Sequence, residues 1–269
     1  AQARQFVRFM NRWLLGVPER SLPDLDDASF VLDPYPELQC HPRPDVNMRS
    51  LALARAVELA AGRDRCAERI RGAARSLSSA GEAVPTPPAL AGEPFQVWTH
   101  QWQQLLLQPE VGIELPVSFL YPLAGPAPTL LHLDDQHRNR LLYRDGALAR
   151  ASHFIEREAH GSGVFSVDLR GWGDSSPAMY PYELAGGGGI DRYLAYASAA
   201  LGDPVLAMRI RDALAALAYL RTRPEALPDR ILVSGAGMAG LVALHVAALD
   251  ARVQGVIAWD CPVSFEALL

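Results

Sequence analysis

The chain has 269 residues, 49% of them hydrophobic and 20% charged, a composition typical of a soluble globular protein with one large domain. Its formal net charge is −5 and its basic residues are scattered, which argues against a nucleic-acid-binding surface. The sequence contains no lysine, and this excludes a lysine nucleophile or Schiff base. Cys40, Cys66 and Cys261 have neither a disulfide nor a metal-ligand spacing, so we expect mostly buried thiols.

The first third of the chain is predicted to be helical and to contain no catalytic or ligand-binding residues. Residues 3–15 place large apolar side chains on one helical face, and Gly16 and Pro18 follow as a stop signal. An irregular stretch rich in proline and acidic residues precedes two further helices, within 53–61 and 66–77. The Pro-rich run 84–94 then predicts a stiff, extended spacer. These changes divide the chain into residues 1–16, 17–94 and 95–269.

Beyond the spacer the hydrophobic pattern changes to strands that alternate with helices. Such alternation predicts an α/β fold, with a mostly parallel sheet covered by helices on both faces. The expected strands lie within 95–104, 111–120, 129–133, 164–167, 231–233 and 253–259, and the expected helices within 147–159, 210–220 and 241–249. The nearly apolar run 231–249 is interrupted by glycines, a serine and a histidine, which favours a buried strand and helix over a membrane span.

The strongest local signal is the junction between the last of these strands but one and the helix after it. The aliphatic run 231–233 leads into Gly235, Gly237 and Gly240 and then into the helix. Strand, sharp turn and helix form the nucleophile elbow of G-x-S-x-G sequences, in which the serine lies on a strained turn. Here the position of that serine is Gly237, followed by Met238. Glycine relieves roughly 1–3 kcal/mol of backbone strain at such a turn, but it supplies no nucleophile.

A second motif, Asp168-Leu-Arg170-Gly171-Trp-Gly173-Asp-Ser175, follows a buried strand. We expect its aspartate and arginine to hold the strand end through charge-assisted hydrogen bonds, and its glycines to take positive φ. This turn, followed by the elbow, resembles the α/β-hydrolase family. Within that family the chain is most similar to acetyl xylan esterase and dienelactone hydrolase-like enzymes, through Gly112–Pro116, Gly189–Tyr193 and Arg209–Leu220. The resemblance covers residues 95–269.

The resemblance implies a serine at the elbow, an acid after a later strand and a histidine near the C-terminus. The chain departs from it at Gly237 and ends at Leu269, before the acid and histidine are reached, so the expected sheet lacks its C-terminal strands. The loop that normally helps to form the oxyanion hole reads Asp134-Asp135-Gln136-His137, and carboxylates there oppose oxyanion stabilisation. The N–H of Met238 is expected to point at an empty oxyanion site.

No other side chain is a convincing replacement for the missing serine. Ser234 should point to a face of the sheet, and Ser162 lies between a helix and a strand, which is the wrong order for an elbow. His245 is expected to be a packed or half-exposed residue of the elbow helix. Cys261, next to Asp260, has no visible partner that would stabilise a thiolate.

No metal or cofactor site is predicted. Asp134, Asp135 and His137 could supply ligands, but no second cluster with usable spacing exists, which favours a solvated loop. The glycine run 186–189 does not join a strand to a helix in the manner of a dinucleotide-binding turn, so we interpret it as a flexible insertion.

Two functions follow from these observations. The favoured hypothesis is a degenerate esterase-like domain, a binding or structural module without catalysis at Gly237. The alternative is an active carboxylic-ester hydrolase whose nucleophile was replaced, or whose acid and histidine lie outside this chain. Expected partners are a small-molecule ester or carbohydrate and, because residues 3–15 resemble the last helix of such a domain, a second hydrolase domain of the same protein. Neither nucleic acid nor a membrane is expected, and a xylan esterase-like role would imply secretion or the periplasm.

Overall fold

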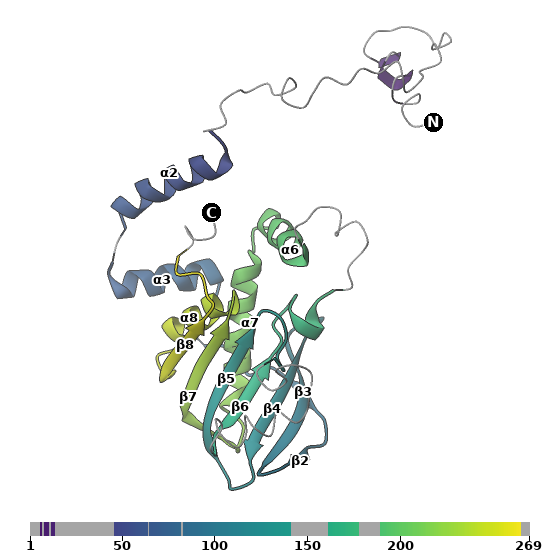
Figure 1. The fold of residues 1–269 in the computed structure, drawn as a ribbon, viewed down its shortest axis with the longest axis vertical. Coiled ribbons are helices and arrows are strands. Elements are labelled where there is room, and N and C mark those ends of the chain that lie inside the picture. The colour runs from purple at the N-terminus through teal and green to yellow at the C-terminus, as the bar shows by residue number, and fades with distance from the viewer. Residues whose placement is uncertain are drawn as a thin grey trace. The chain divides into compact units, whose positions relative to one another are not determined.

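The structure is a computed structural model that describes residues 46–63, 65–81, 83–140, 161–177 and 189–264, with residues 6, 8–10, 12 and 13 (Figure 1). It divides into two compact units, residues 1–55 and 56–269. The described residues between 6 and 13 are helical, as predicted. The helix expected over 147–159, the glycines 186–188 and Cys40 lie outside the described residues. None of the described helices combines the length and the apolarity that crossing a bilayer would need.

The described residues of the second unit form an eight-stranded sheet (Figure 1). Its order is β1–β3–β4–β6–β5–β7–β8, and β2 pairs with β3. Strands β6, β5, β7 and β8 are parallel neighbours, whereas β3, β4 and β6 pair antiparallel. The bounds of the strands are β1 Ala89–Ala91, β2 Phe95–Val97, β3 His100–Glu110, β4 Ile113–Pro122, β5 Ala127–Asp134, β6 Gly163–Val167, β7 Ala226–Ala236 and β8 Gly255–Trp259. The predicted α/β fold is confirmed, and its sheet is mixed, with parallel strands from β6 to the β8 edge beside an antiparallel part.

Helices flank this sheet. Helix α3 packs against α7 and α8, and α8 also packs against β7 and β8. All five residues of β6 are buried, so both faces of the sheet are covered at its centre. The core is formed by Phe165 and Leu131 of the strands together with Leu217 of α7 and Val242 of α8. The helices are α2 Met48–Ala61, α3 Ala67–Ser78, α6 Gly189–Ala200, α7 Val205–Leu220 and α8 Ala239–Leu249, with a 3₁₀ turn, η3, at Gly173–Ser175.

The structure differs from the sequence prediction in and after the Pro-rich run 84–94. Residues Ala89–Ala91 of that run form β1 and pair antiparallel with Leu105–Leu107 of β3. The prolines flank this segment and leave its backbone N–H groups available for pairing, so an extended spacer can also serve as an edge strand. The strand expected over 95–104 is a tight hairpin instead, because Trp98 turns the chain with φ 58° between β2 and β3.

Candidate active site

The turn between β7 and α8 has the strained geometry that its sequence predicts. Gly237 has φ +61°, in the left-handed region that favours glycine, and its N–H donates to the Trp259 carbonyl oxygen at 3.0 Å. A Cβ on Gly235 would lie 2.6 Å from the Cα of Gly240, so strand and helix approach too closely for a side chain there. The elbow backbone, here residues 235–240, is therefore intact, and the side chain of its central residue is absent.

A carboxylate fills the space in front of the elbow. Asp135, on the loop after β5, accepts a hydrogen bond from the Met238 N–H, with 2.7 Å between N and Oδ2. A Cβ added to Gly237 would lie 2.7 Å from the Asp135 Cγ and in closer conflict with its Oδ2. The expectation that the Met238 N–H points at an empty oxyanion site is thus wrong, because this N–H already has an anionic acceptor.

Burial raises the pKa of Asp135 above its ordinary value, and the neighbouring carboxylates of Asp134 and Asp191 act in the same direction. The hydrogen bond from Met238 opposes this shift in pKa without cancelling it. Asp135 is half-buried and forms no ion pair with a described residue. Its charge is therefore balanced chiefly by a backbone dipole.

A pocket of about 460 Å³ opens beside Asp135, at the edge of the sheet where the parallel strands end. Trp172 in its wall donates from Nε1 to Asp191 at 3.0 Å. The Arg209 guanidinium lies 3.7 Å from the centre of the Trp172 ring and also pairs with Asp191 at 2.5 Å. The lining residues are Asp135, Gln136, Gly171, Trp172, Gly173, Ser176 and Asp191. The roles of Trp172, Asp191 and Arg209 were not predicted from the sequence, although all three lie within the segments that carry the family resemblance.

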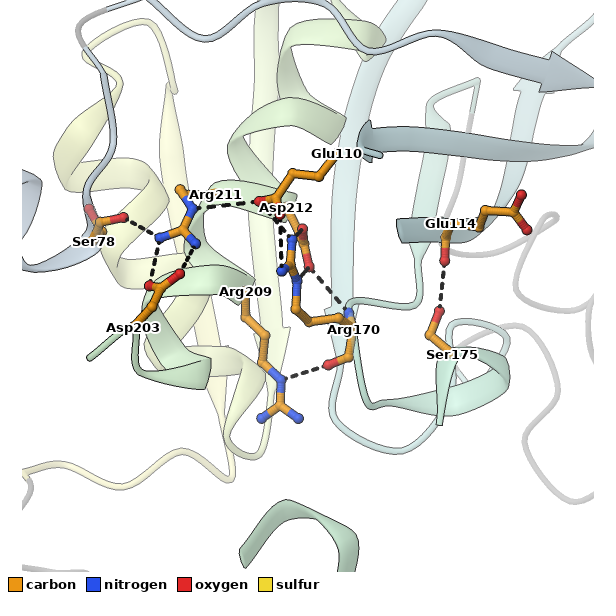
Figure 2. Close-up of polar contacts among 9 residues, drawn as sticks. All are labelled: Ser78, Glu110, Glu114, Arg170, Ser175, Asp203, Arg209, Arg211 and Asp212. Atoms are coloured by element: carbon orange, nitrogen blue, oxygen red, sulfur yellow. Dashed lines mark hydrogen bonds and ion pairs between the residues drawn. The ribbon is translucent and has the colours of Figure 1, made fainter. Parts of the chain in front are cut away.

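The motif after β6 has the structural role that was expected of it. Asp168 is fully buried, pairs with the Arg138 guanidinium and accepts from the Asp174 N–H at 3.0 Å. Arg170 pairs with Asp212 of α7 at 2.5 Å and with Glu110 of β3 at 3.0 Å, so it joins three elements (Figure 2). The expected positive φ is found at both glycines of this turn.

Three groups of metal-binding type do come together, namely His137, Asp168 and Asp174, with ligand atoms within 4.8 Å of one another. The Arg138 guanidinium pairs with both carboxylates, so this cluster already contains a cation. The prediction of a solvated loop is wrong for Asp134, which is only 3% exposed. Its Oδ1 accepts from the Gln136 N–H at 2.8 Å and shapes the turn that presents Asp135.

The two serines considered as replacement nucleophiles lie away from the elbow turn. Ser234 is buried within β7, and its Oγ lies 3.0 Å from Nδ1 of His132 on β5. Burial lowers the pKa of His132 to about 4, and its ring stacks on Trp259. Ser162 lies just before β6, where its carbonyl oxygen accepts from His100. Neither hydroxyl lines the pocket beside Asp135.

The remaining candidates also have structural surroundings. His245 is half-buried on α8, and its Nδ1 lies 2.7 Å from the Leu241 carbonyl oxygen. Cys261 is half-buried beside Gly240, and burial raises the pKa of its thiol, so no thiolate is favoured there. Cys66 is exposed, contrary to the expected burial, because its segment packs little apolar surface.

Comparison with known proteins identifies the fold. No protein-family model matches the chain. The "Putative hydrolase YtaP" of Bacillus subtilis (strain 168) is 29% identical over 160 residues, which cover 56% of this chain and 50% of that protein. Among solved structures, a "putative acetyl xylan esterase" from Bacteroides fragilis NCTC 9343 aligns with a TM-score of 0.56 and 19% identity, over 71% of this chain and 51% of that one. The structure of "Methylesterase BT1017" aligns with a TM-score of 0.51 and 18% identity, over 71% of this chain and 39% of that one.

The chain therefore has the α/β-hydrolase fold, as the sequence predicted. It spans about half the length of YtaP and of the Bacteroides protein. Similarity at this level of sequence identity shows the fold alone, so the chemistry of the site must be argued from this chain's own residues.

Proposed function

We propose that this domain is a non-catalytic, esterase-like module that retains the α/β-hydrolase fold for binding. One observation carries the proposal: the Asp135 carboxylate accepts from the Met238 N–H and blocks the place of a side chain at Gly237. The elbow has no serine to react, and the Met238 N–H that would stabilise an oxyanion already donates to Asp135.

The electrostatics of this arrangement oppose acyl transfer. An oxyanion hole works because preorganised donors face the oxygen on which negative charge develops. Here the donor faces a carboxylate, and a second carboxylate, Asp134, lies next to it in the chain. Negative charge developing on a substrate at this point would be repelled. The arrangement stabilises the free protein and not a transition state.

The pocket beside Asp135 supports a binding role. Carboxylate groups of Asp135 and Asp191 and the amide of Gln136 offer acceptors and donors to a ligand rich in hydroxyl groups, and about 460 Å³ suits a small molecule. A carbohydrate or a small ester is the ligand class we propose for it. Substrate binding of this kind needs no reacting serine.

A second function, carboxylic-ester hydrolysis, is favoured by one observation. The elbow backbone keeps its positive φ at Gly237 although no serine needs presenting there. Under this alternative another group performs the attack, and Asp135, with its raised pKa and its position at the elbow, is the residue to examine.

The two functions predict different outcomes with p-nitrophenyl acetate, acetylated xylan and a fluorophosphonate probe. The binding module should show neither a burst nor turnover and should not be labelled by the probe. Stoichiometric labelling, or turnover that Asp135→Ala abolishes, would overturn the proposal in favour of the hydrolase.

A matched pair of variants sharpens this test. Gly237→Ser alone should be inactive, because the new side chain meets the Asp135 carboxylate. Gly237→Ser combined with Asp135→Ala clears that space and releases the Met238 N–H, so it is the variant most able to react. A burst of p-nitrophenol from this folded double variant, with none from the original protein, would show that Gly237 and the Asp135 contact are what prevent reaction, as the module predicts; turnover by the original protein that is lost in Asp135→Ala would support the hydrolase instead.

A further inference from the structure

We propose that a second pocket, at the C-terminal end of α8, binds a small molecule that carries a carboxylate or phosphate group. The pocket has a volume of about 520 Å³ and lies among α3, α7 and α8. Among the described residues that line it, the charged ones are three arginines and one aspartate, namely Arg75, Arg221, Arg252 and Asp250. Positive charge therefore dominates a concave site in a protein whose net charge is negative.

Arg221 provides the strongest evidence for a ligand. Its side chain is 9% exposed and forms an ion pair through one terminal nitrogen, Nη1, with Asp250. Its Nε and Nη2 are buried and have no hydrogen-bond acceptor among the residues that the structure describes. Buried guanidinium donors are rarely left unpaired, because the loss of hydration is then uncompensated. A rotation of this side chain toward the pocket that it lines would bring these donors to an oxyanion bound there.

The other two arginines can reach the same ligand. Arg75 of α3 donates from Nη2 to the Leu249 carbonyl oxygen at 3.3 Å, which leaves its other donors for a ligand. Arg252 is 66% exposed and donates to Asp250 at the rim. Guanidinium groups present parallel donors that match carboxylate and phosphate oxygens, so three of them suit a multiply charged anion.

Asp250 does not neutralise this site. Burial alone would raise its pKa, but hydrogen bonds from Arg252 and Arg221 lower that pKa to about 2. The aspartate is therefore ionised at neutral pH and accounts for one negative charge against three guanidinium groups. The remaining positive charge is available to a ligand.

Helix capping explains part of this cluster but not all of it. Arg75 lies in the last turn of α3 and Arg221 at the C-cap of α7, where cations interact favourably with the helix dipole. Capping uses the terminal carbonyl groups, however, and leaves Nε and Nη2 of Arg221 without acceptors. The pocket is also distinct from the elbow, since α8 has 11 residues and separates them by roughly 16 Å. The proposal is thus independent of the function proposed above.

The test is a titration of the whole chain with sodium phosphate and, separately, with sodium citrate, at constant ionic strength maintained with NaCl. Calorimetry and the thermal midpoint Tm are the readouts. We expect saturable binding and a rise in Tm that NaCl does not produce. Tighter binding of citrate would assign the ligand to the carboxylates, and tighter binding of phosphate to the phosphoryl compounds.

Three variants decide whether the arginines form the site. Arg252→Gln removes an exposed side chain, so it should fold normally and bind about tenfold more weakly, the effect of one charge-assisted contact. Arg221→Met should abolish binding. Arg192→Gln, an exposed arginine of α6 outside the pocket, should bind like the original protein. Absence of saturable binding beyond NaCl, or unchanged affinity in Arg252→Gln, would overturn the proposal.

Discussion

The loops after β5 and β6 leave neighbouring parallel strands at one edge of the sheet, and both carry carboxylates. In the described part of the β6 loop, Asp168 pairs with Arg138. Arg170 pairs with Asp212 and Glu110 (Figure 2). In the β5 loop Asp135 forms no ion pair with a described residue and instead accepts from the Met238 N–H. The carboxylates of two neighbouring loops at one sheet edge are thus balanced in different ways.

This difference separates an aspartate that joins elements through an ion pair from one that faces the elbow turn. A carboxylate paired with a buried guanidinium holds elements together, and its environment lowers the cost of its charge. Burial raises the pKa of Asp135, and the hydrogen bond from the Met238 N–H and the more distant charge of Arg140 do not cancel this effect. Its position at the elbow gives the Met238 N–H an acceptor.

The largest expected effect comes from the paired aspartate. Asp168→Asn leaves the Arg138 guanidinium without its buried counter-charge, so the free energy of unfolding should fall by about 3 kcal/mol. Urea denaturation monitored by circular dichroism measures this loss. Asp174→Asn is the matched control, because Asp174 pairs with the same arginine but is 55% exposed, and it should cost less than about 1 kcal/mol. Equal losses in the two variants would contradict the comparison.

An intermediate effect is expected at the elbow itself. Gly237→Ala adds a Cβ at φ +61° that also meets the Asp135 carboxylate, and should cost about 2 kcal/mol. In an Asp135→Ala background the new Cβ no longer meets the carboxylate. The loss in free energy of unfolding should then be only about 1 kcal/mol, which comes from the left-handed backbone conformation. A double-mutant cycle from urea denaturation isolates the difference as a coupling energy. Additive losses would show that Asp135 does not fill this space.

The sequence was sufficient for the fold because the relevant signals are local. The alternation of aliphatic runs with helical periodicity located β5, β6, β7, α7 and α8. The three glycines of 235–240 predicted a strained turn, and the positive φ of Gly237 agrees. The strand β1 was missed because prolines dominate its surroundings and its pairing with β3 is a long-range contact.

The site was only partly predictable for a related reason. The residues of the elbow are consecutive, but the contact that defines its state joins Asp135 to Met238, which are distant in sequence. Charge at Asp134 and Asp135 was recognisable, yet sequence cannot tell that Asp134 is buried and shapes a turn while Asp135 reaches the elbow. Arg138, the partner of Asp168, gives no signal of its own among scattered arginines.

The smallest effect, and the one of opposite sign, is expected for Asp135→Asn. The folded-state pKa of Asp135 is raised above its unfolded value, so its ionisation begins to destabilise the native state as the pH rises above the unfolded-state pKa and does so fully above the raised pKa. Asparagine keeps an oxygen for the Met238 N–H and removes the charge, which should stabilise the protein at neutral pH by about 0.5 kcal/mol. Below the unfolded-state pKa of about 3.9, the Asp135 carboxyl is protonated in both the folded and the unfolded protein. The stabilisation by asparagine should therefore vanish at such pH values. Urea denaturation at neutral pH and at about pH 3.5 measures both limits. A loss of stability at neutral pH, in the same direction as for Asp168→Asn, would mean that the Asp135 charge is structural after all.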